Sequence, residues 1–485
     1  MRDRREVFRV HKFRRVYDRK AGKFSFNISY ETHTELTDRS LAVAEAFGLG
    51  VDEDQKFKVL DAELKIGPKD IAYVTGESGS GKSVLLRAIR KDLGDEAIDL
   101  SEVCIEADKP LIENVGSSVE EGLDLLSKVG LNDAFLFLRT YNQLSDGQKY
   151  RYRIAKLMES GKQWWLMDEF AATLDRDTAK IVAFNLQKLA RRMGKAVIAA
   201  TTHGDLFEDL SPSVHVHKRF GEEITVNYYS NNPAEECSLV KEMVIEGGYL
   251  SDWRRLSGFH YRSHRVGPSR EIYRLRRGVE LCGVIVYCYP PPGCSGRRLV
   301  LPKMSLKGLN VGLSTISRIV VHPKYRSIGL GAKLIRETLP RVGTPNVEMI
   351  AVMAKYNPFA EKAGMKKIFE QKPSREVLRV ADVLASLGFD LKLLGSQKHI
   401  AETLGLLSSE QIGELKEAFI KHGHPRFRRE IAATRHMPYG TTAMYAEGIK
   451  NADMERTVKL IKIVGMLLQT KVYLFWSKRL EVKCS

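Results

Sequence analysis

The stretch IAYVTGESGSGKSVLLRAI, residues 71–89, combines three local patterns that together indicate one structural unit. Its first four residues are apolar and predict a buried strand, whereas the apolar residues after Lys82 recur at helical spacing and predict a helix. The residues between them, GESGSGKS at 76–83, fit the phosphate-binding pattern G-x-x-x-x-G-K-[ST]. A strand, a glycine-rich loop and a helix in this order predict an α/β domain that binds a nucleotide.

The residue types of this loop suit phosphate binding. Glycines at 76, 79 and 81 allow backbone N–H groups to turn toward a β-phosphate. Lys82 is expected to reach the β- and γ-phosphates, and the Ser83 hydroxyl is expected to ligate Mg²⁺. A flexible Gly/Ser turn is the alternative, but the flanking strand and helix argue against it. The cofactor-binding residues predicted here are Gly76, Gly79, Gly81, Lys82 and Ser83.

A second apolar strand, in QWWLMDEF at 163–170, ends in two adjacent carboxylates. Asp168 is expected to hold Mg²⁺ through water, and Glu169 is expected to orient the attacking water. Two solvated acids at the end of a buried strand are the alternative. The predicted metal ligands are therefore Ser83 and Asp168.

These motifs, together with others in the same order, resemble those of the ABC-type ATPases. LSDGQ at 144–148 resembles the signature loop, with Asp146 at its third position, and ATLD at 172–175 resembles the D-loop. Glu106 stands where a glutamine is expected. The resemblance covers residues 1–230 and implies ATP as a cofactor. It also implies roles for Phe57 on the adenine, for Ser145, Gly147 and Gln148 in the signature, and for His203 as the switch histidine.

The resemblance has a consequence for assembly. In that family the signature loop of one domain completes the ATP site of a second domain, and this chain has one such set of motifs. It therefore implies a head-to-tail homodimer with two ATP molecules between the subunits. An ATPase that works with separate membrane subunits is the alternative, and the second domain described next argues against it.

Another glycine-containing turn lies in STISRIVVHPKYRSIGLGAKLIRETL, residues 314–339, which reads as strand, turn and helix. The turn places Arg326, Gly329 and Gly331 directly before the helix. A helix N-terminus with glycines and one arginine is suited to a pyrophosphate.

This segment resembles the GNAT acetyltransferases, and the likeness extends to VEMIAVMAKYNPFAEKAGM at 347–365. It implies that acetyl-CoA binds at Arg326, Gly329 and Gly331 and that the backbone at Ile319 and Val321 holds the pantetheine. Ala360 stands where the family is expected to have the tyrosine that protonates the departing thiolate. Tyr356, Glu361 or Tyr287 could replace that tyrosine, thiolate departure could need no acid, or the domain could bind acyl-CoA without turnover.

The chain is strongly basic, with a formal net charge of +17. Residues 253–278 carry eight arginines against one acid, with aromatic residues interleaved, and residues 1–20 carry nine Lys/Arg against three acids. Arginines beside aromatic rings suit phosphate contacts and base stacking, so we expect a nucleic acid, RNA or DNA, as a partner. Among nucleic acids, RNA and in particular tRNA is favoured. A solvated basic face with core aromatics is the alternative.

The remaining features complete the expected organisation. Residues 231–247 are expected to form a linker, 248–375 a GNAT-like α+β domain and 376–485 a helical C-terminal extension, which makes an α/β multidomain protein. No signal peptide or membrane span is apparent, so a cytoplasmic protein is expected. Cys282, Cys288 and Cys294 are expected to be plain thiols, with a metal site as the alternative.

The predicted function is ATP-coupled transfer of acetyl from acetyl-CoA to an amine, on structured RNA such as tRNA. The alternatives are a nucleic-acid-binding ATPase whose second domain only senses acyl-CoA, and a protein acetyltransferase.

Overall fold

The computed structural model describes residues 8–32, 37–49, 55–260, 266–352, 354, 357–434 and 437–478. The chain divides into two compact units. The first comprises Met1–Arg265, Ile272–Ile285 and Ile319–Leu334, and the second comprises Val266–Glu271, Val286–Arg318 and Ile335–Ser485.

A six-stranded sheet forms the centre of the first unit, with strand order β5-β6-β7-β4-β8-β9. Its pairs are parallel except for β8 with β9. Parallel strands are covered on both faces and read as continuous apolar runs, and every residue of β4, β6 and β7 is buried. The strands are β4 (Ile71–Thr75), β5 (Ala97–Asp99), β6 (Trp164–Met167), β7 (Ala196–Thr201), β8 (Val214–Lys218) and β9 (Ile224–Tyr228).

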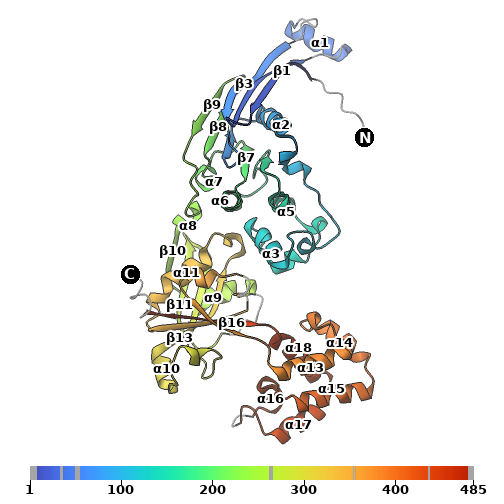
Figure 1. Ribbon diagram of the computed structural model, residues 1–485, viewed down its shortest axis with the longest axis vertical. Helices are drawn as coiled ribbons and strands as arrows, with labels where there is room; N and C mark the ends of the chain where they lie inside the picture. The colour runs from blue at the N-terminus through green and yellow to red at the C-terminus, as the bar shows by residue number, and fades with distance from the viewer. Residues whose placement is uncertain are drawn as a thin grey trace. The chain divides into compact units, whose positions relative to one another are not determined.

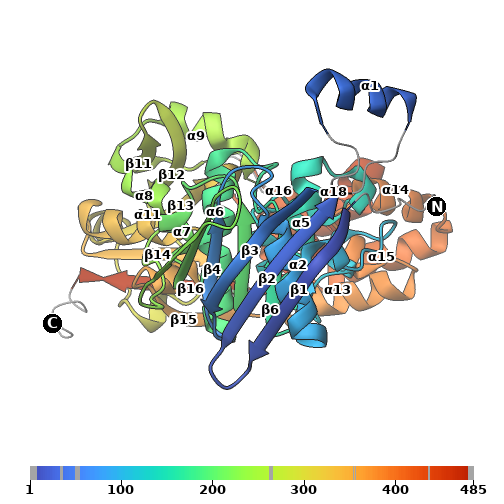
Figure 2. The same cartoon turned by 90° about the horizontal axis from the view of Figure 1, so that it is seen from above.

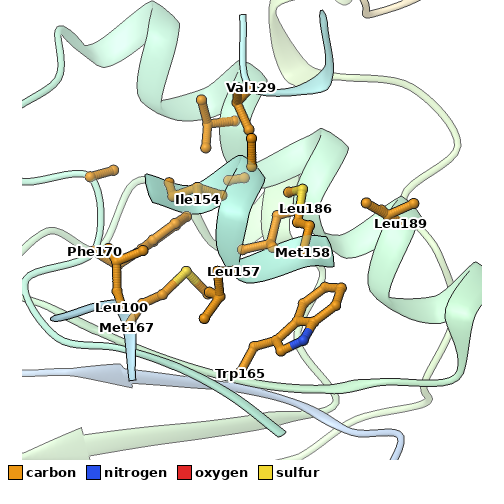
Figure 3. Close-up of a cluster of buried hydrophobic side chains, with 14 of the residues drawn as sticks. Leu100, Val129, Ile154, Leu157, Met158, Trp165, Met167, Phe170, Leu186 and Leu189 are labelled. Carbon is orange, nitrogen blue, oxygen red and sulfur yellow. The ribbon is translucent and has the colours of Figure 1, made fainter. Parts of the chain in front are cut away.

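Helices pack on this sheet through apolar faces. Figure 3 shows Leu157 and Met158 in one buried cluster with Trp165 of β6 and Leu186. Leu157 and Met158 lie on the helix that follows the signature motif, and Leu186 lies on the helix that follows the D-loop motif. The helices of this part are α2 (Lys82–Leu93), α3 (Val119–Lys128), α4 (Ala134–Phe137), α5 (Asp146–Glu159), α6 (Arg176–Met193), α7 (Phe207–Leu210), α8 (Ser238–Lys241) and α9 (Leu250–Leu256).

Three antiparallel strands at the N-terminus run side by side (Figures 1 and 2). Phe24, Phe26 and Ile28 alternate along the second strand, as one buried face of a strand requires, and they join a cluster with Trp164 of β6. This small sheet therefore shares a core with the main sheet. Its elements are β1 (Phe8–Asp18), β2 (Lys23–Thr32) and β3 (Gln55–Lys65), with α1 (Asp38–Phe47) inserted before β3.

A seven-stranded sheet follows, with strand order β10-β11-β12-β13-β14-β16-β15. Strands β13 and β14 are parallel and are connected through α11, whereas β16 pairs antiparallel with β14 and with β15. The elements are β10 (Met243–Gly247), β11 (Ser269–Arg277), β12 (Glu280–Cys288), α10 (Leu306–Gly312), β13 (Leu313–Val321), α11 (Leu330–Thr338), β14 (Asn346–Ala351), α12 (Phe359–Lys362), β15 (Lys366–Gln371) and β16 (Lys471–Ser477).

Two expected boundaries need correction. Residues 231–247 are not only a linker, because 243–247 form β10, which pairs with β11 through its backbone. The region 376–485 is not only helical, because 471–477 form β16 in the interior of the sheet. The short apolar run of β16 has no periodicity that separates it from a helix end, and only its pairing with β14 and β15 decides its state.

Six helices precede β16 and share a core of their own, which includes Leu384, Phe419, Phe427 and Tyr445 (orange to red in Figure 1). Within the described residues, no helix is both long and apolar enough to cross a membrane. The six are α13 (Arg375–Ser386), α14 (Gln397–Gly405), α15 (Ser409–Lys421), α16 (Pro425–Ala432), α17 (Thr442–Lys450) and α18 (Met454–Leu467).

A buried ion pair joins three strands of the second unit. The Arg297 guanidinium donates to both carboxylate oxygens of Glu348 on β14, at 2.6 and 3.0 Å. The hydroxyls of Thr315 on β13 and Tyr473 on β16 donate to the same carboxylate, at 2.8 and 3.0 Å. The four hydrogen bonds compensate the carboxylate for its loss of water.

Candidate functional site

The glycine-rich loop joins β4 to α2 in a backbone form that requires glycine. Gly76, Gly79 and Gly81 have φ angles of +148°, +80° and +100°. A Cβ at Gly76 would lie 2.0 Å from the carbonyl oxygen of Lys218, and a Cβ at Gly81 would lie 2.7 Å from Val59 Cγ1. At Gly76 and Gly81 a side chain is excluded by contact as well as by φ, and at Gly79 the positive φ alone favours glycine.

The lysine of the loop is held inside it. Lys82 Nζ donates to the carbonyl oxygens of Gly76 at 2.8 Å and Glu77 at 2.6 Å. Burial lowers the pKa of Lys82, and the carboxylates of Asp168 and Glu169 oppose this shift. These residues fit an anionic phosphate group, which would give the ammonium a charged partner in place of two carbonyls.

A buried hydroxyl in the same loop also fits an anion. Ser80 is 3% exposed, and its Oγ is buried without a hydrogen-bond partner among the described residues. An unpaired buried hydroxyl costs free energy that a ligand oxygen would recover.

The two carboxylates follow β6. Asp168 is half-buried and Glu169 is exposed, and the Glu169 N–H donates to Asp168 Oδ1 at 3.0 Å. Glu169 and Ala171 have φ angles of +50° and +58°, which cost non-glycine residues free energy and cluster at functional sites. The Ala171 N–H donates to the hydroxyl of Tyr150 on α5 at 2.8 Å. The strained turn is thereby tied to the helix of the signature motif.

The histidine follows β7, which lies between β6 and β4. The Tyr73 hydroxyl donates to the His203 carbonyl, and the His203 N–H donates to Thr201 Oγ1 at 3.3 Å. The carboxyl ends of parallel strands meet at one sheet edge, which is where ligands bind in open α/β sheets. The fold therefore brings the phosphate loop, the carboxylates and His203 to one edge.

The signature motif caps α5. The Ser145 N–H donates to Gln148 Oε1 at 3.0 Å, and Ser145 itself is exposed. The Asp146 side chain is 97% exposed, and a Cβ at Gly147 would meet only ordinary contacts. The motif thus forms the capped but exposed N-terminus of a 14-residue helix.

Two other expected residues of this site are placed as follows. Phe57 lies on β3 opposite Tyr30 in the backbone register, but its side chain is outside the described residues. Glu106 is exposed and pairs with Lys109 at 2.6 Å.

The second expected phosphate loop follows β13 and carries φ angles of +72° at Ser327 and +88° at Gly329. The Arg326 guanidinium donates to the carbonyls of Val321 at 3.0 Å, Asn132 at 2.8 Å and Phe259 at 3.2 Å. Arg326 therefore organises the loop through backbone contacts, which the sequence pattern did not predict.

The other residues expected around that loop lie on β13, α11 and α12. Ile319 and Val321 are half-buried near the end of β13, and Gly331 lies in the first turn of α11. Glu361 on α12 is half-buried and Ala360 is buried, whereas Tyr356 lies outside the described residues.

The loop before α11 contacts the helix that follows the D-loop motif. Asp177, in the first turn of α6, pairs with Lys324 Nζ at 2.6 Å and Arg277 Nη1 at 2.9 Å. Burial opposes its charge, but hydrogen bonds from Lys324 and Arg277 outweigh burial and lower the pKa of Asp177. Asn185 of α6 donates to Ser327 Oγ at 2.9 Å. Sequence reasoning missed this cluster, because no local pattern relates residues about 150 positions apart.

Three of the eight arginines in the stretch 253–278 pair with acids of the same chain. Arg274 and Arg276 contact Glu246 at 2.9 and 3.0 Å, and Arg277 contacts Glu242 at 2.6 Å. Residues 261–265 of the stretch lie outside the described residues. The described part therefore has a structural role that the sequence did not reveal.

Among the described residues, no group of three or more His, Cys, Asp or Glu side chains is placed so that it could hold a metal ion. Cys282 and Cys288 are buried free thiols. Burial raises the pKa of Cys282 to about 11, so the thiol stays protonated.

Comparisons with known proteins concern the first part of the chain. Residues 59–172 match the family model described as "ABC transporter". The methionine import ATP-binding protein MetN of Xanthomonas oryzae is 29% identical over 204 residues, which are 34% of this chain and 60% of that protein. The cytochrome c biogenesis ATP-binding export protein CcmA of Agrobacterium fabrum is 26% identical over 191 residues, 32% of this chain and 87% of that protein. A bacterial ABC transporter cassette, MJ0796, described as dimeric, superimposes with a TM-score of 0.30 and 20% identity, covering 36% of this chain and 92% of its own.

The matched part of the chain, residues 59–172, is an ABC-type ATPase domain. The chain spans about 60% of the length of the MetN relative. The residues that match the family model end before β7.

Proposed function

We propose that the protein couples ATP hydrolysis to transfer of an acetyl group from acetyl-CoA to an amine. One observation carries this proposal: the segment 322–331 joins the end of a parallel strand to a helix N-terminus, and it contacts α6 of the ATPase domain through the pairs Lys324–Asp177 and Ser327–Asn185. A binding loop in this position suits a pyrophosphate. Its contact with α6 offers a physical connection between two ligands.

In the ATPase part, Lys82 and the glycine-loop N–H groups would hold the β- and γ-phosphates. Ser83 and Asp168 would hold Mg²⁺, which would neutralise charge on the phosphates. Glu169 would orient the attacking water, and His203 would contact the γ-phosphate.

We propose that two copies assemble head to tail. The Ser145 end of α5 is exposed, and the N-terminus of a helix suits a phosphate. In the assembly, Ser145, Gly147 and Gln148 of one copy would close the ATP site of the other.

In the acetyltransferase part, Gly329 and Gly331 would present backbone N–H groups to the pyrophosphate. Arg326 would act as a positioning residue, because its guanidinium holds three carbonyls around the loop. Ile319 and Val321 would hold the pantetheine arm. Tyr356 or Glu361 would protonate the departing thiolate.

Acetyl transfer is tested by incubating the full chain with labelled acetyl-CoA and, separately, total RNA, DNA and protein. Each mixture is run with ATP, without nucleotide and with a non-hydrolysable ATP analogue. We expect label in RNA, and only with hydrolysable ATP. Label in protein alone would refute RNA as the acceptor of the acetyl group. Equal label under all three nucleotide conditions would refute the coupling of acetyl transfer to ATP hydrolysis.

The relatives favour one competing function. MetN and CcmA are named as import and export ATP-binding proteins, so this chain could drive a separate membrane partner. In that case ATP hydrolysis would be present, acetyl transfer would be absent in every mixture, and Gly329→Glu would leave hydrolysis unaltered.

A further inference from the structure

An open cavity of about 640 Å³ lies in the second unit, and none of its lining residues belongs to the sites proposed above for ATP or acetyl-CoA. Its volume falls in the range of cavities that hold small ligands. Three parts of the chain meet there, namely the start of β11, the residue after β12, and α10. The cavity is lined by Arg270, Tyr289, Leu306, Lys307, Asn310 and Val311.

One wall of this cavity is held in place by contacts within the chain. The guanidinium carbon of Arg270 lies 4.5 Å from the centroid of the Tyr289 ring, and the same guanidinium donates to the Asn310 carbonyl. The Tyr289 N–H donates to the Pro268 carbonyl at 3.1 Å. The ring and the cation are therefore positioned before a ligand arrives, which lowers the entropy cost of binding.

The positive charge of this cavity is not neutralised by its lining. No acidic residue lines it, and residues 281–336 contain no Asp or Glu. Within the part of the chain that the structure describes, neither Arg270 nor Lys307 pairs with a carboxylate. Glu271 follows Arg270 on β11, but successive side chains of a strand point to opposite faces. The cavity therefore favours an anionic ligand.

The remaining lining is apolar and exposed. Leu306 is 57% exposed, Val311 is 70% exposed and Tyr289 is 44% exposed. Large apolar side chains that gather in the open are typical of binding surfaces. The side-chain amide of Asn310 has no hydrogen-bond partner among the described residues, so it is available to a polar ligand edge. A fitting ligand has a negative charge, a flat apolar group and a hydrogen-bonding edge.

We infer that this cavity binds one unstacked nucleotide of single-stranded RNA. A nucleotide combines the three required features, and RNA-binding proteins hold unstacked bases on aromatic side chains and arginine. Tyr289 and the apolar side chains of α10 contact the base, and Arg270 and Lys307 contact the phosphates. The choice of RNA rests on the proposed function, in which RNA accepts the acetyl group.

The test measures fluorescence anisotropy of a labelled oligouridylate with the full chain, over a series of salt concentrations. Tyr289→Ala is expected to weaken binding about tenfold through lost stacking, whereas Tyr289→Phe keeps the ring and should bind normally. Lys307→Ala should reduce the slope of log affinity against log salt by about 0.7, the value for one phosphate contact on a single strand. Arg298→Ala is the matched control, because Arg298 is exposed and lies outside the cavity lining, and it should leave the slope unchanged.

Inorganic polyphosphate separates the base from the charge. Tyr289→Ala should bind polyphosphate normally, and Lys307→Ala should bind it less tightly. Normal oligouridylate affinity in Tyr289→Ala, an equal change of slope in Lys307→Ala and Arg298→Ala, or tighter binding of an apolar acidic peptide than of oligouridylate would each overturn the inference.

Failure of this inference and failure of the proposed function are distinguishable. Uracil has no exocyclic amine, so binding of oligouridylate does not depend on acetyl transfer. Loss of oligouridylate binding in Tyr289→Ala, together with no acetyl label in RNA, would support the cavity and refute the proposed function. Acetyl label in RNA together with normal oligouridylate binding by Tyr289→Ala would refute the cavity alone.

Discussion

Replacement of Glu348 by glutamine removes one charge from the buried pair of the second unit and keeps the size of the side chain. The Glu348 side chain is fully buried and that of Arg297 is 7% exposed, so water cannot solvate the guanidinium once its partner is neutral. Breaking a buried ion pair in this way costs about 3–5 kcal/mol of unfolding free energy. The loss should appear in the cooperative unit that contains β14 and β16.

Urea unfolding followed by circular dichroism measures this loss. With a slope of about 2 kcal/mol/M, the transition of that unit should move about 1.5–2.5 M lower. Glu455→Gln is the matched control, because Glu455 forms an exposed pair with Lys459 at 2.8 Å, and it should cost less than about 0.5 kcal/mol.

A double replacement separates charge loss from packing loss. Arg297→Met with Glu348→Leu should recover much of the stability lost in Glu348→Gln, because no unpaired charge remains. A loss below about 1 kcal/mol in Glu348→Gln would refute the reasoning, since it would mean that the carboxylate is solvated and that β16 does not lie between β14 and β15.

Glu169→Gln should bind ATP, hydrolyse it slowly and accumulate as a dimer in sizing experiments with ATP; a monomer at micromolar protein would contradict the head-to-tail assembly. Gly329→Glu should lose acetyl-CoA binding in calorimetry, because the new side chain occupies the loop. Gly343→Glu is the control and should bind acetyl-CoA normally, since Gly343 has a similar φ of +81° and open space around it. Equal acetyl-CoA binding by both variants would contradict the proposed acetyl-CoA site. The pKa of Asp177 is lowered, so its stabilisation is present above its ordinary value of 3.8 and is lost as pH falls through the folded value. In Asp177→Asn the melting temperature should therefore fall less as the pH is lowered than it does in the unchanged protein. The same dependence of melting temperature on pH in both would argue against the pairing of Asp177 with Lys324.

The sequence by itself determined the ATPase part, because its signals are local. The glycines at 76, 79 and 81 each meet a backbone requirement, and the apolar runs of β4 and β6 lead directly into the residues that are expected to carry the chemistry. Such signals need only a few neighbouring residues, so they can be read before the fold is known.

Only the tertiary structure decided the features that depend on distant residues. The run at 471–477 is a strand because β14 and β15 supply hydrogen-bond partners on both sides, although about a hundred residues separate it from β15. Arg274 and Arg277 are paired rather than open to a polyanion because β10 and α6 bring acids beside them. The Lys218 carbonyl lies beside Gly76 of the glycine-rich loop because β8 is hydrogen-bonded to β4. The sequence shows which residues are able to form strand pairs or ion pairs. Which partner each residue meets depends on contacts between residues far apart in the chain, and these leave no local sequence pattern.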